Sequence, residues 1–119
     1  MAYKLVLTWQ VRDWLRELRK GEQTTRRLVA AAIDRLTDEG PALGRPMADH
    51  VAGSRLHNLK ELRPGSAGKS EVRILFIFDP LRNAVLLVAG DKSGRWQEWY
   101  RESIPLAEAL YDEYLKESS

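Results

Sequence analysis

Apolar residues recur at two different periods in the first third of the chain. From Tyr3 to Trp9 every second residue is apolar or aromatic, which predicts a short strand. From Val11 to Leu18 the apolar spacing becomes i, i+3, i+4, i+7, which predicts a helix that ends at Gly21. The same spacing returns over residues 22–39 and stops at a Gly-Pro pair, so a second helix completes a helical hairpin.

The middle of the chain has the pattern of an antiparallel meander. Residues 40–54 are rich in Gly and Pro and predict a loop. Three strands are expected next, over 56–63, 70–79 and 83–89, with turn residues between them. The second should be central, because both of its faces are apolar beyond the first turn. In the first, leucines recur every three residues, so a bulge, a bend or a short helix stays open there.

The last segment predicts a terminal amphipathic helix. Ala107, Leu110, Tyr111 and Tyr114 have helical spacing, and Pro105 leaves open whether a break precedes them. The sequence therefore predicts an α+β fold in one domain over residues 1–119: an N-terminal strand, a helical hairpin, a three-stranded antiparallel meander and a C-terminal helix.

Composition narrows the chemistry. The chain contains no cysteine, which excludes disulfides, thiolate metal sites and a cysteine nucleophile. No apolar run has the length of a membrane helix, and we expect a cytoplasmic protein. The net charge is only +2, but residues 55–101 carry 9 cations against 5 anions, whereas residues 102–119 carry 1 against 5. A basic middle segment suits a polyanionic partner.

Cations and aromatic residues are interleaved around the predicted meander, a combination that binds phosphates and stacks unpaired bases. Arg73 stands where the central strand begins, so the rigid strand would aim its charge. Each of the other cations has an alternative reading as a solvated or salt-bridged side chain. Trp99 is expected to pack inward, which leaves Tyr100 as the functional aromatic. The candidates for binding RNA are Lys60, Arg63, Lys69, Arg73, Lys92, Arg95, Trp96 and Tyr100.

The sequence gives little support for a metal site, for a Ser/His/Asp triad or for a phosphate-binding loop. His50 and His57 have no second ligand at metal-like spacing and no Ser/His/Asp pattern, so no metal or other cofactor is expected. The segment from Gly65 to Ser70 includes Gly-Lys-Ser, but its spacing differs from that of a phosphate-binding loop and a strand follows it.

The order of elements resembles the RelE/ParE superfamily of bacterial toxins, and within it the HigB-like branch of phage-derived Gp49-like proteins. The stretches that carry the resemblance are LTWQVRDWLREL, DEGPALGRP, LHNLKELRPG, EVRILFIFDP and LLVAGDKSGRW. The resemblance runs nearly end to end. It implies a RelE-like, microbial-ribonuclease-like fold and the toxin of a type II toxin–antitoxin pair that cleaves mRNA, usually on the ribosome, without a metal ion.

The resemblance also implies roles for individual residues. Arg73 matches the strand arginine that holds the scissile phosphate, and Lys60 with Arg63 matches basic positions of the preceding strand. Lys92 and Arg95 occupy the basic segment after the last strand, and Tyr100 takes the place of a base-stacking or proton-handling aromatic. We expect Arg73, Lys60, Lys92 and Tyr100 to be catalytic and Arg63, Lys69, Arg95 and Trp96 to bind RNA. Glu61 stands where some relatives have lysine, so lysine and tyrosine both stay open as the proton-transfer group.

Two other functions stay open. One is a noncatalytic inhibitor of DNA gyrase, as in the ParE branch, and the other is a plain protein-binding module. The expected partners are mRNA, the ribosome and a cognate antitoxin of the helix-turn-helix type, which would cover the basic groove or displace the terminal helix. No membrane partner is expected.

Overall fold

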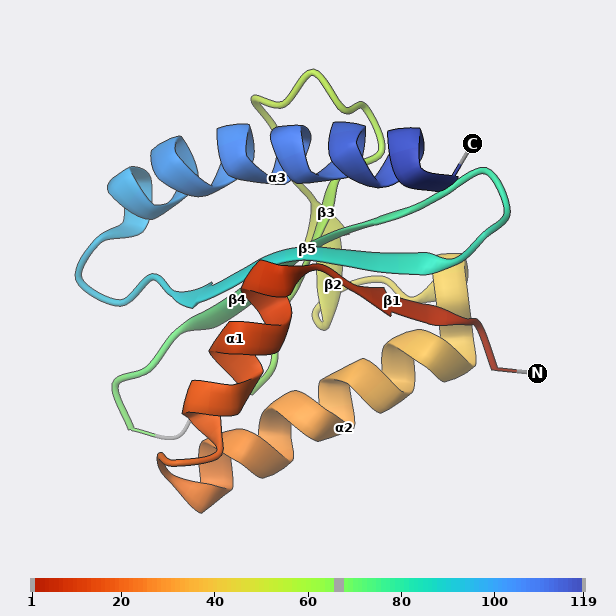
Figure 1. Cartoon of the computed structure of the whole chain (residues 1–119). Helices are drawn as coiled ribbons and strands as arrows, with labels where there is room; N and C mark the ends of the chain where they lie inside the picture. The colour runs from red at the N-terminus through yellow and green to blue at the C-terminus, as the bar shows by residue number, and fades with distance from the viewer. Residues whose placement is uncertain (1, 66–67, 119) are drawn as a thin grey trace.

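A five-stranded sheet forms the middle layer of the protein, with helices on both of its faces (Figure 1). The computed structural model describes residues 2–65 and 68–118. The elements, in chain order, are β1 (Leu5–Leu7), α1 (Trp9–Leu18), α2 (Gln23–Glu39), a 3₁₀ turn η1 (Gly40–Ala42), β2 (Ala48–His50), β3 (Lys60–Leu62), β4 (Val72–Phe78), β5 (Ala84–Asp91) and α3 (Trp96–Ser118).

The strand order is β1-β5-β4-β3-β2, which confirms the meander β3-β4-β5 and the central place of β4. β1 pairs in parallel with β5, and the other neighbours are antiparallel. The segment 40–54, expected to be a loop, contains the edge strand β2, which is only three residues long and therefore too short to show a period in the sequence. β1 and β3 are shorter than expected, and the leucine repeat before β3 forms turns rather than a helix.

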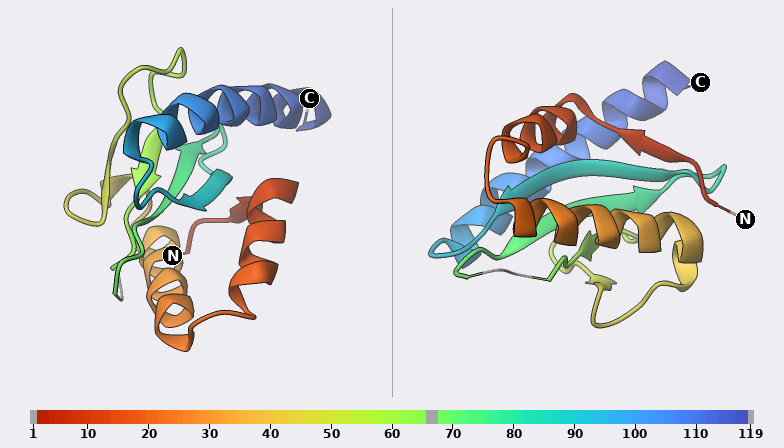
Figure 2. Two further views of the ribbon diagram at one scale, coloured as in Figure 1. Left: turned by 90° about the vertical axis from the view of Figure 1, so that its left-hand side faces the viewer. Right: turned by 90° about the horizontal axis from the view of Figure 1, so that it is seen from below.

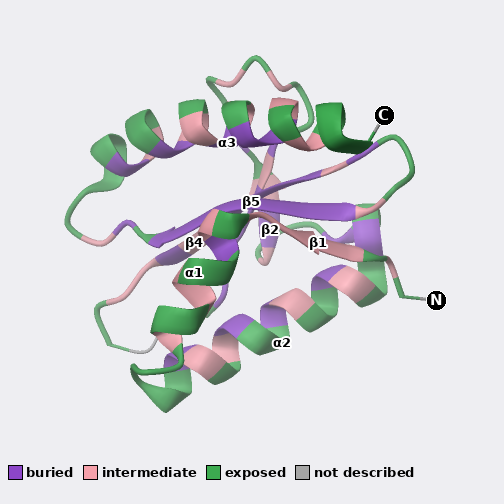
Figure 3. Ribbon diagram, viewed as in Figure 1, coloured by how far each residue is buried: buried purple, intermediate pink, exposed green. Residues whose placement is uncertain are grey.

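Alternation along β4 divides the interior into two layers. Val72, Ile74 and Phe76 pack toward α1 and α2, whereas Leu75 and Ile77 pack toward α3. Side views show α3 on one side of the sheet and the α1–α2 hairpin on the other (Figure 2), and the strands between them are mostly buried (Figure 3). Because side chains alternate along a strand, Arg73 lies on the α3 side.

An irregular pairing in the sheet decides which residues of β5 share that side. Leu75 pairs with Val88 and Phe76 with Leu86, so Leu87 is left without a partner on β4. Leu87 and Val88 consequently both pack toward α3. This bulge shifts the alternation by one residue. Gly90, which pairs with Arg73, therefore lies on the α3 side, and Lys92 lies on the same side. Without the extra residue they would lie on the α1–α2 side.

The helices lie where the sequence predicts them, with two differences. Trp9, expected to end the first strand, begins α1, because the Thr8 side chain accepts a hydrogen bond from the Val11 amide and caps the helix. α3 begins at Trp96 and continues through Pro105. A proline inside a helix costs about 3 kcal/mol, and the burial of Trp99, Ala107 and other residues on both sides of it opposes that cost. No helix in the described parts of the chain is long and apolar enough to cross a bilayer.

The turn between β4 and β5 is held by a buried carboxylate. Asp79 accepts hydrogen bonds from the Leu81 and Asn83 amides and from the Tyr114 hydroxyl of α3. Burial opposes ionisation of Asp79, but the bonds from Tyr114 and Asn83 outweigh it and lower its pKa. In this turn Arg82 has a φ of 67°, the left-handed region that glycine adopts without strain.

Replacing Arg82 with glycine should therefore stabilise the protein by about 0.5–1 kcal/mol, because the left-handed backbone costs a residue with a Cβ more than it costs glycine. Urea unfolding measures the change. The matched control is Arg27→Gly inside α2, which should destabilise by about 0.5–1 kcal/mol. If both variants lose stability equally, the turn conformation carries no strain.

Candidate active site

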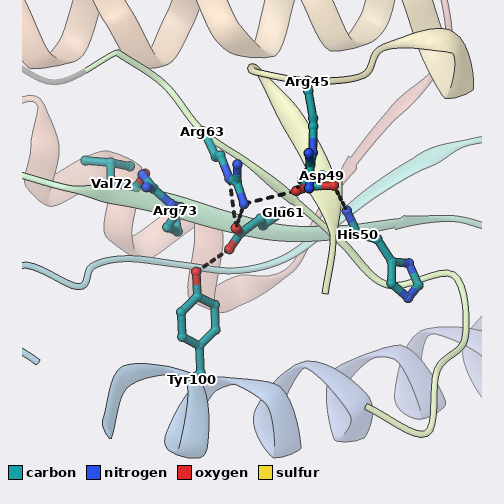
Figure 4. Close-up of polar contacts among 8 residues, drawn as sticks. All are labelled: Arg45, Asp49, His50, Glu61, Arg63, Val72, Arg73 and Tyr100. Atoms are coloured by element: carbon teal, nitrogen blue, oxygen red, sulfur yellow. Dashed lines mark hydrogen bonds and ion pairs between the residues drawn. The ribbon is translucent and has the colours of Figure 1, made fainter. Parts of the chain in front are cut away.

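Side chains from four parts of the chain meet where β4 begins and β5 ends, against the first turns of α3. Figure 4 draws Arg73, Glu61 and Tyr100 of this group. Arg73 comes from β4, Glu61 from β3, Lys92 from the residue after β5, and Tyr100 from α3. Gly90 permits the close packing. A Cβ at Gly90 would lie 2.4 Å from Nε1 of Trp99, so only glycine lets α3 approach the sheet this closely.

The Arg73 guanidinium is not neutralised by an acidic neighbour. One terminal nitrogen donates a 2.8 Å hydrogen bond to the Val72 carbonyl, and Nε is buried without a hydrogen-bond partner. Among the described residues, no carboxylate lies within ion-pair distance of Arg73. A buried guanidinium donor without a partner is costly to the fold, and Nε of Arg26 shares this property. What favours anion binding at Arg73 is that its positive charge has no carboxylate partner among the described residues.

Lys92 is a nearly buried lysine, with 4% of its surface exposed. Its Nζ lies 3.5 Å from the centroid of the Trp96 ring and 5.1 Å from that of Tyr100. Burial lowers the pKa of Lys92, and the positive charge of Arg73 lowers it further, while Glu61 and Glu71 oppose the change. More of this amine is therefore neutral at a given pH than for a lysine in water.

Glu61 is also nearly buried, with 4% of its surface exposed, and it joins two candidate residues. It accepts a 2.5 Å hydrogen bond from the Tyr100 hydroxyl and a 2.9 Å hydrogen bond from Nε of Arg63. Burial, and then the bond to Glu61, raises the pKa of Tyr100, and the nearby Arg73 only partly opposes this. Tyr100 therefore retains its proton and is a poor general base.

Two arginines expected to bind phosphate are engaged by carboxylates. Arg63 pairs with Glu61 at 2.8 Å and with Asp49 at 3.3 Å (Figure 4). Arg95 contacts Glu102 at 2.7 Å and Glu98 at 3.6 Å. Their charges are thus largely balanced within the protein, so a phosphate would have to compete with the carboxylates.

Of the other predicted site residues, Lys60 lies away from Arg73 and Lys92, whereas Lys69 and Trp96 lie near them. Lys60 pairs with Phe76 on the α1–α2 side, opposite Glu61 and Arg73, so strand alternation separates it from the cluster. Lys69 is exposed and lines a depression of about 600 Å³ together with Arg63 and Arg73. Trp96 is 54% exposed, covers Lys92 and donates from Nε1 to Glu71 at 3.1 Å. Trp99 packs inward, as expected.

Sequence reasoning missed the central position of Glu61. A signal was present, because Glu61 shares one strand face with Leu59, and a carboxylate on an apolar face indicates a buried, paired group. No comparable signal marked the bulge at Leu87. Among the described residues, no group of three or more His, Asp or Glu side chains is placed to hold a metal ion.

The neighbouring charges should control the pKa of Lys92 in opposite directions. Arg73→Ala should raise it toward the ordinary lysine value, because a repulsive charge is removed. Glu71→Gln should lower it further, because an attractive charge is removed. Titration of lysine-labelled protein by NMR measures both shifts. Equal shifts of the same sign would contradict the electrostatic coupling.

Comparisons with known proteins agree with this architecture. The model of the family described as "Phage derived protein Gp49-like (DUF891)" matches residues 13–112. From Mycobacterium tuberculosis, "Putative toxin HigB2" is 54% identical over 106 residues, which are 89% of this chain and 51% of that protein. "Putative toxin HigB3" from the same organism is 47% identical over 111 residues, 93% of this chain and 92% of that protein. The chain thus spans about half the length of the first relative.

A solved structure extends the comparison to the fold. The YoeB dimer from Staphylococcus aureus aligns with a TM-score of 0.57 at 9% identity, over 74% of this chain and 94% of that one. At that identity the likeness concerns the fold alone. The family match and the two relatives identify the chain as a member of the phage-derived Gp49-like family, in the HigB-like branch of the RelE/ParE toxin superfamily.

Proposed function

We propose that this chain is the toxin of a type II toxin–antitoxin pair and that it inhibits translation by cleaving mRNA, on the ribosome and without a metal ion. Both relatives carry the word toxin in their names, which supports the first part. The second part rests on one observation: Arg73, which has no carboxylate partner among the described residues, lies beside the buried Lys92, whose pKa is lowered. An anion site next to an amine that loses its proton more readily than an ordinary lysine suits phosphodiester cleavage.

Arg73 would bind the scissile phosphate. Its guanidinium can donate two parallel hydrogen bonds to phosphate oxygens, and the sheet holds its backbone rigidly. Lys69, on the same depression, would add a less specific attraction for the RNA backbone. Charge develops on the phosphate during the reaction, and loss of one such donor typically costs about 10²–10³ in rate.

Lys92 would act as the general base. In its neutral form Nζ takes the proton of the ribose 2′-hydroxyl while O2′ attacks the adjacent phosphorus. The O2′–P bond forms, the P–O5′ bond breaks, and the departing 5′-oxygen takes a proton from solvent. Tyr100 is unsuited to remove this proton, because its own proton is held in the hydrogen bond to Glu61.

Tyr100, Glu61 and Arg63 would keep the cluster in place. Glu61 fixes the Tyr100 hydroxyl, and the Tyr100 ring forms one wall around Lys92. Trp96 covers the other side of the amine and exposes enough of its ring to stack on an RNA base. Lys60, on the opposite side of the sheet, has no role in this scheme.

An antitoxin that neutralises the positive charge around Arg73 is the natural regulator of such a toxin. The depression beside Arg63, Lys69 and Arg73 suits an acidic segment, because a carboxylate could occupy the position of the phosphate. We propose a cognate antitoxin of the helix-turn-helix type as the partner.

Replacing Arg73 with alanine should abolish growth arrest and reduce RNA cleavage by about 10²–10³-fold. Induction in bacteria, followed by mapping of RNA ends and circular dichroism of the purified protein, separates loss of activity from loss of fold. Arg27→Ala on α2 is the matched control and should stay toxic. An equally toxic Arg73→Ala would remove the proposal, and inhibition of DNA supercoiling without RNA cleavage would favour gyrase as the target.

The cleavage rate should depend on the protonation of Lys92. Because only the neutral amine accepts the proton, the single-turnover rate should rise about tenfold per pH unit below the pKa of Lys92 and then level off. The lowered pKa moves this plateau to a lower pH than for an ordinary lysine. Lys92→Gln should lose about 10²–10⁴ in rate and this pH dependence, whereas Lys20→Gln should keep both. An unchanged profile in Lys92→Gln would assign the base elsewhere.

A further inference from the structure

A second depression, of about 450 Å³, lies between β2 and α3 and shares Glu61 and Tyr100 with the active site. Val51, Ala52 and Ile104 provide its apolar lining. The volume falls within the range of about 300–1,000 Å³ that is usual for small-molecule pockets. Because Tyr100 and Glu61 separate this depression from Arg73, a ligand bound there would adjoin the phosphate site.

Two polar side chains of α3 border the depression with their hydrogen-bonding groups unused. They are the amide of Gln97 and the guanidinium of Arg101, and both residues are exposed. Within residues 2–65 and 68–118, neither side chain makes a hydrogen bond or an ion pair. An apolar lining with a few convergent polar groups is the usual composition of a ligand site.

The two walls of the depression are fastened to each other. Glu108 of α3 accepts hydrogen bonds from the Ser54 hydroxyl at 2.8 Å and from the Arg55 amide at 2.9 Å. Arg55 also forms an ion pair with Asp112. The Val51 amide donates to the Leu59 carbonyl at 3.0 Å, which ties the other end of this loop to the sheet. The depression is therefore a built feature of the fold.

We propose that this depression is a nucleobase subsite, which receives the base of a nucleotide next to the phosphate held by Arg73. The inference rests on the proposed function and adds the part of the protein that reads the RNA sequence. A flat base matches the apolar lining, and glutamine and arginine side chains pair with base edges through two parallel hydrogen bonds. Gln97 and Arg101 determine which base is accepted.

Nucleotide binding tests the subsite without relying on cleavage. The purified protein, residues 1–119, is titrated with the four nucleoside 3′-monophosphates and, as a probe without a base, with ribose 5-phosphate, while the side-chain NMR signals of Gln97 and Arg101 are followed. At least one nucleotide should shift both signals and bind more tightly than ribose 5-phosphate. Gln97→Ala should weaken that nucleotide about fivefold or more, and Gln23→Ala, a glutamine in the first turn of α2, should leave it unchanged.

Cleavage mapping supplies the second readout. Gln97→Ala should change the bases found at the cut sites while RNA cleavage continues, whereas Arg73→Ala should stop cleavage. Nucleotide binding in the depression by a chain that cuts no RNA would keep the subsite and overturn the proposed nuclease. Equal binding of ribose 5-phosphate, or cut sites unchanged in Gln97→Ala, would overturn the subsite.

Discussion

The extra residue in β5 is the constraint on which the candidate site depends. Leu87 has no partner on β4, so the alternation of β5 changes phase between Leu86 and Val88. This single offset brings Lys92 to the side of the sheet that α3 covers, beside Arg73. Gly90 pairs with Arg73 across the two strands, and because it has no Cβ, Trp99 of α3 can lie against the sheet. Bulges are common next to active sites because they re-aim side chains in this way.

The resulting cluster combines groups that are unfavourable for folding when taken singly. Lys92 is buried beside a second positive charge, and Arg73 keeps a buried nitrogen without a hydrogen-bond partner. Glu61 is the compensating charge, but its hydrogen bonds go to Tyr100 and Arg63. The fold therefore satisfies the carboxylate and leaves Arg73 and Lys92 with unused capacity for an anion. Such local costs are typical of functional sites.

The two depressions on either side of Glu61 and Tyr100 suggest how one small domain could hold a length of RNA. The first is bordered by Arg63, Lys69 and Arg73 and suits a phosphate. The second has an apolar lining and unused polar side chains, and it suits a base. Phosphate contacts position a nucleic acid and base contacts select its sequence. Under the proposed function, the first depression would therefore supply affinity and the second would supply specificity.

The sequence by itself determined the helices, the meander and the central position of β4, because hydrophobic period and turn residues are local properties. It also predicted a functional role for Arg73, and that role stays a prediction. Only the tertiary structure decided which cations act together. Lys60 and Glu61 are neighbours in sequence, yet strand alternation sends them to opposite sides of the sheet. Arg63 and Arg95 resemble Arg73 in sequence but find carboxylates in space. Register, bulges and ion pairs depend on which distant segments meet, and no local pattern records that.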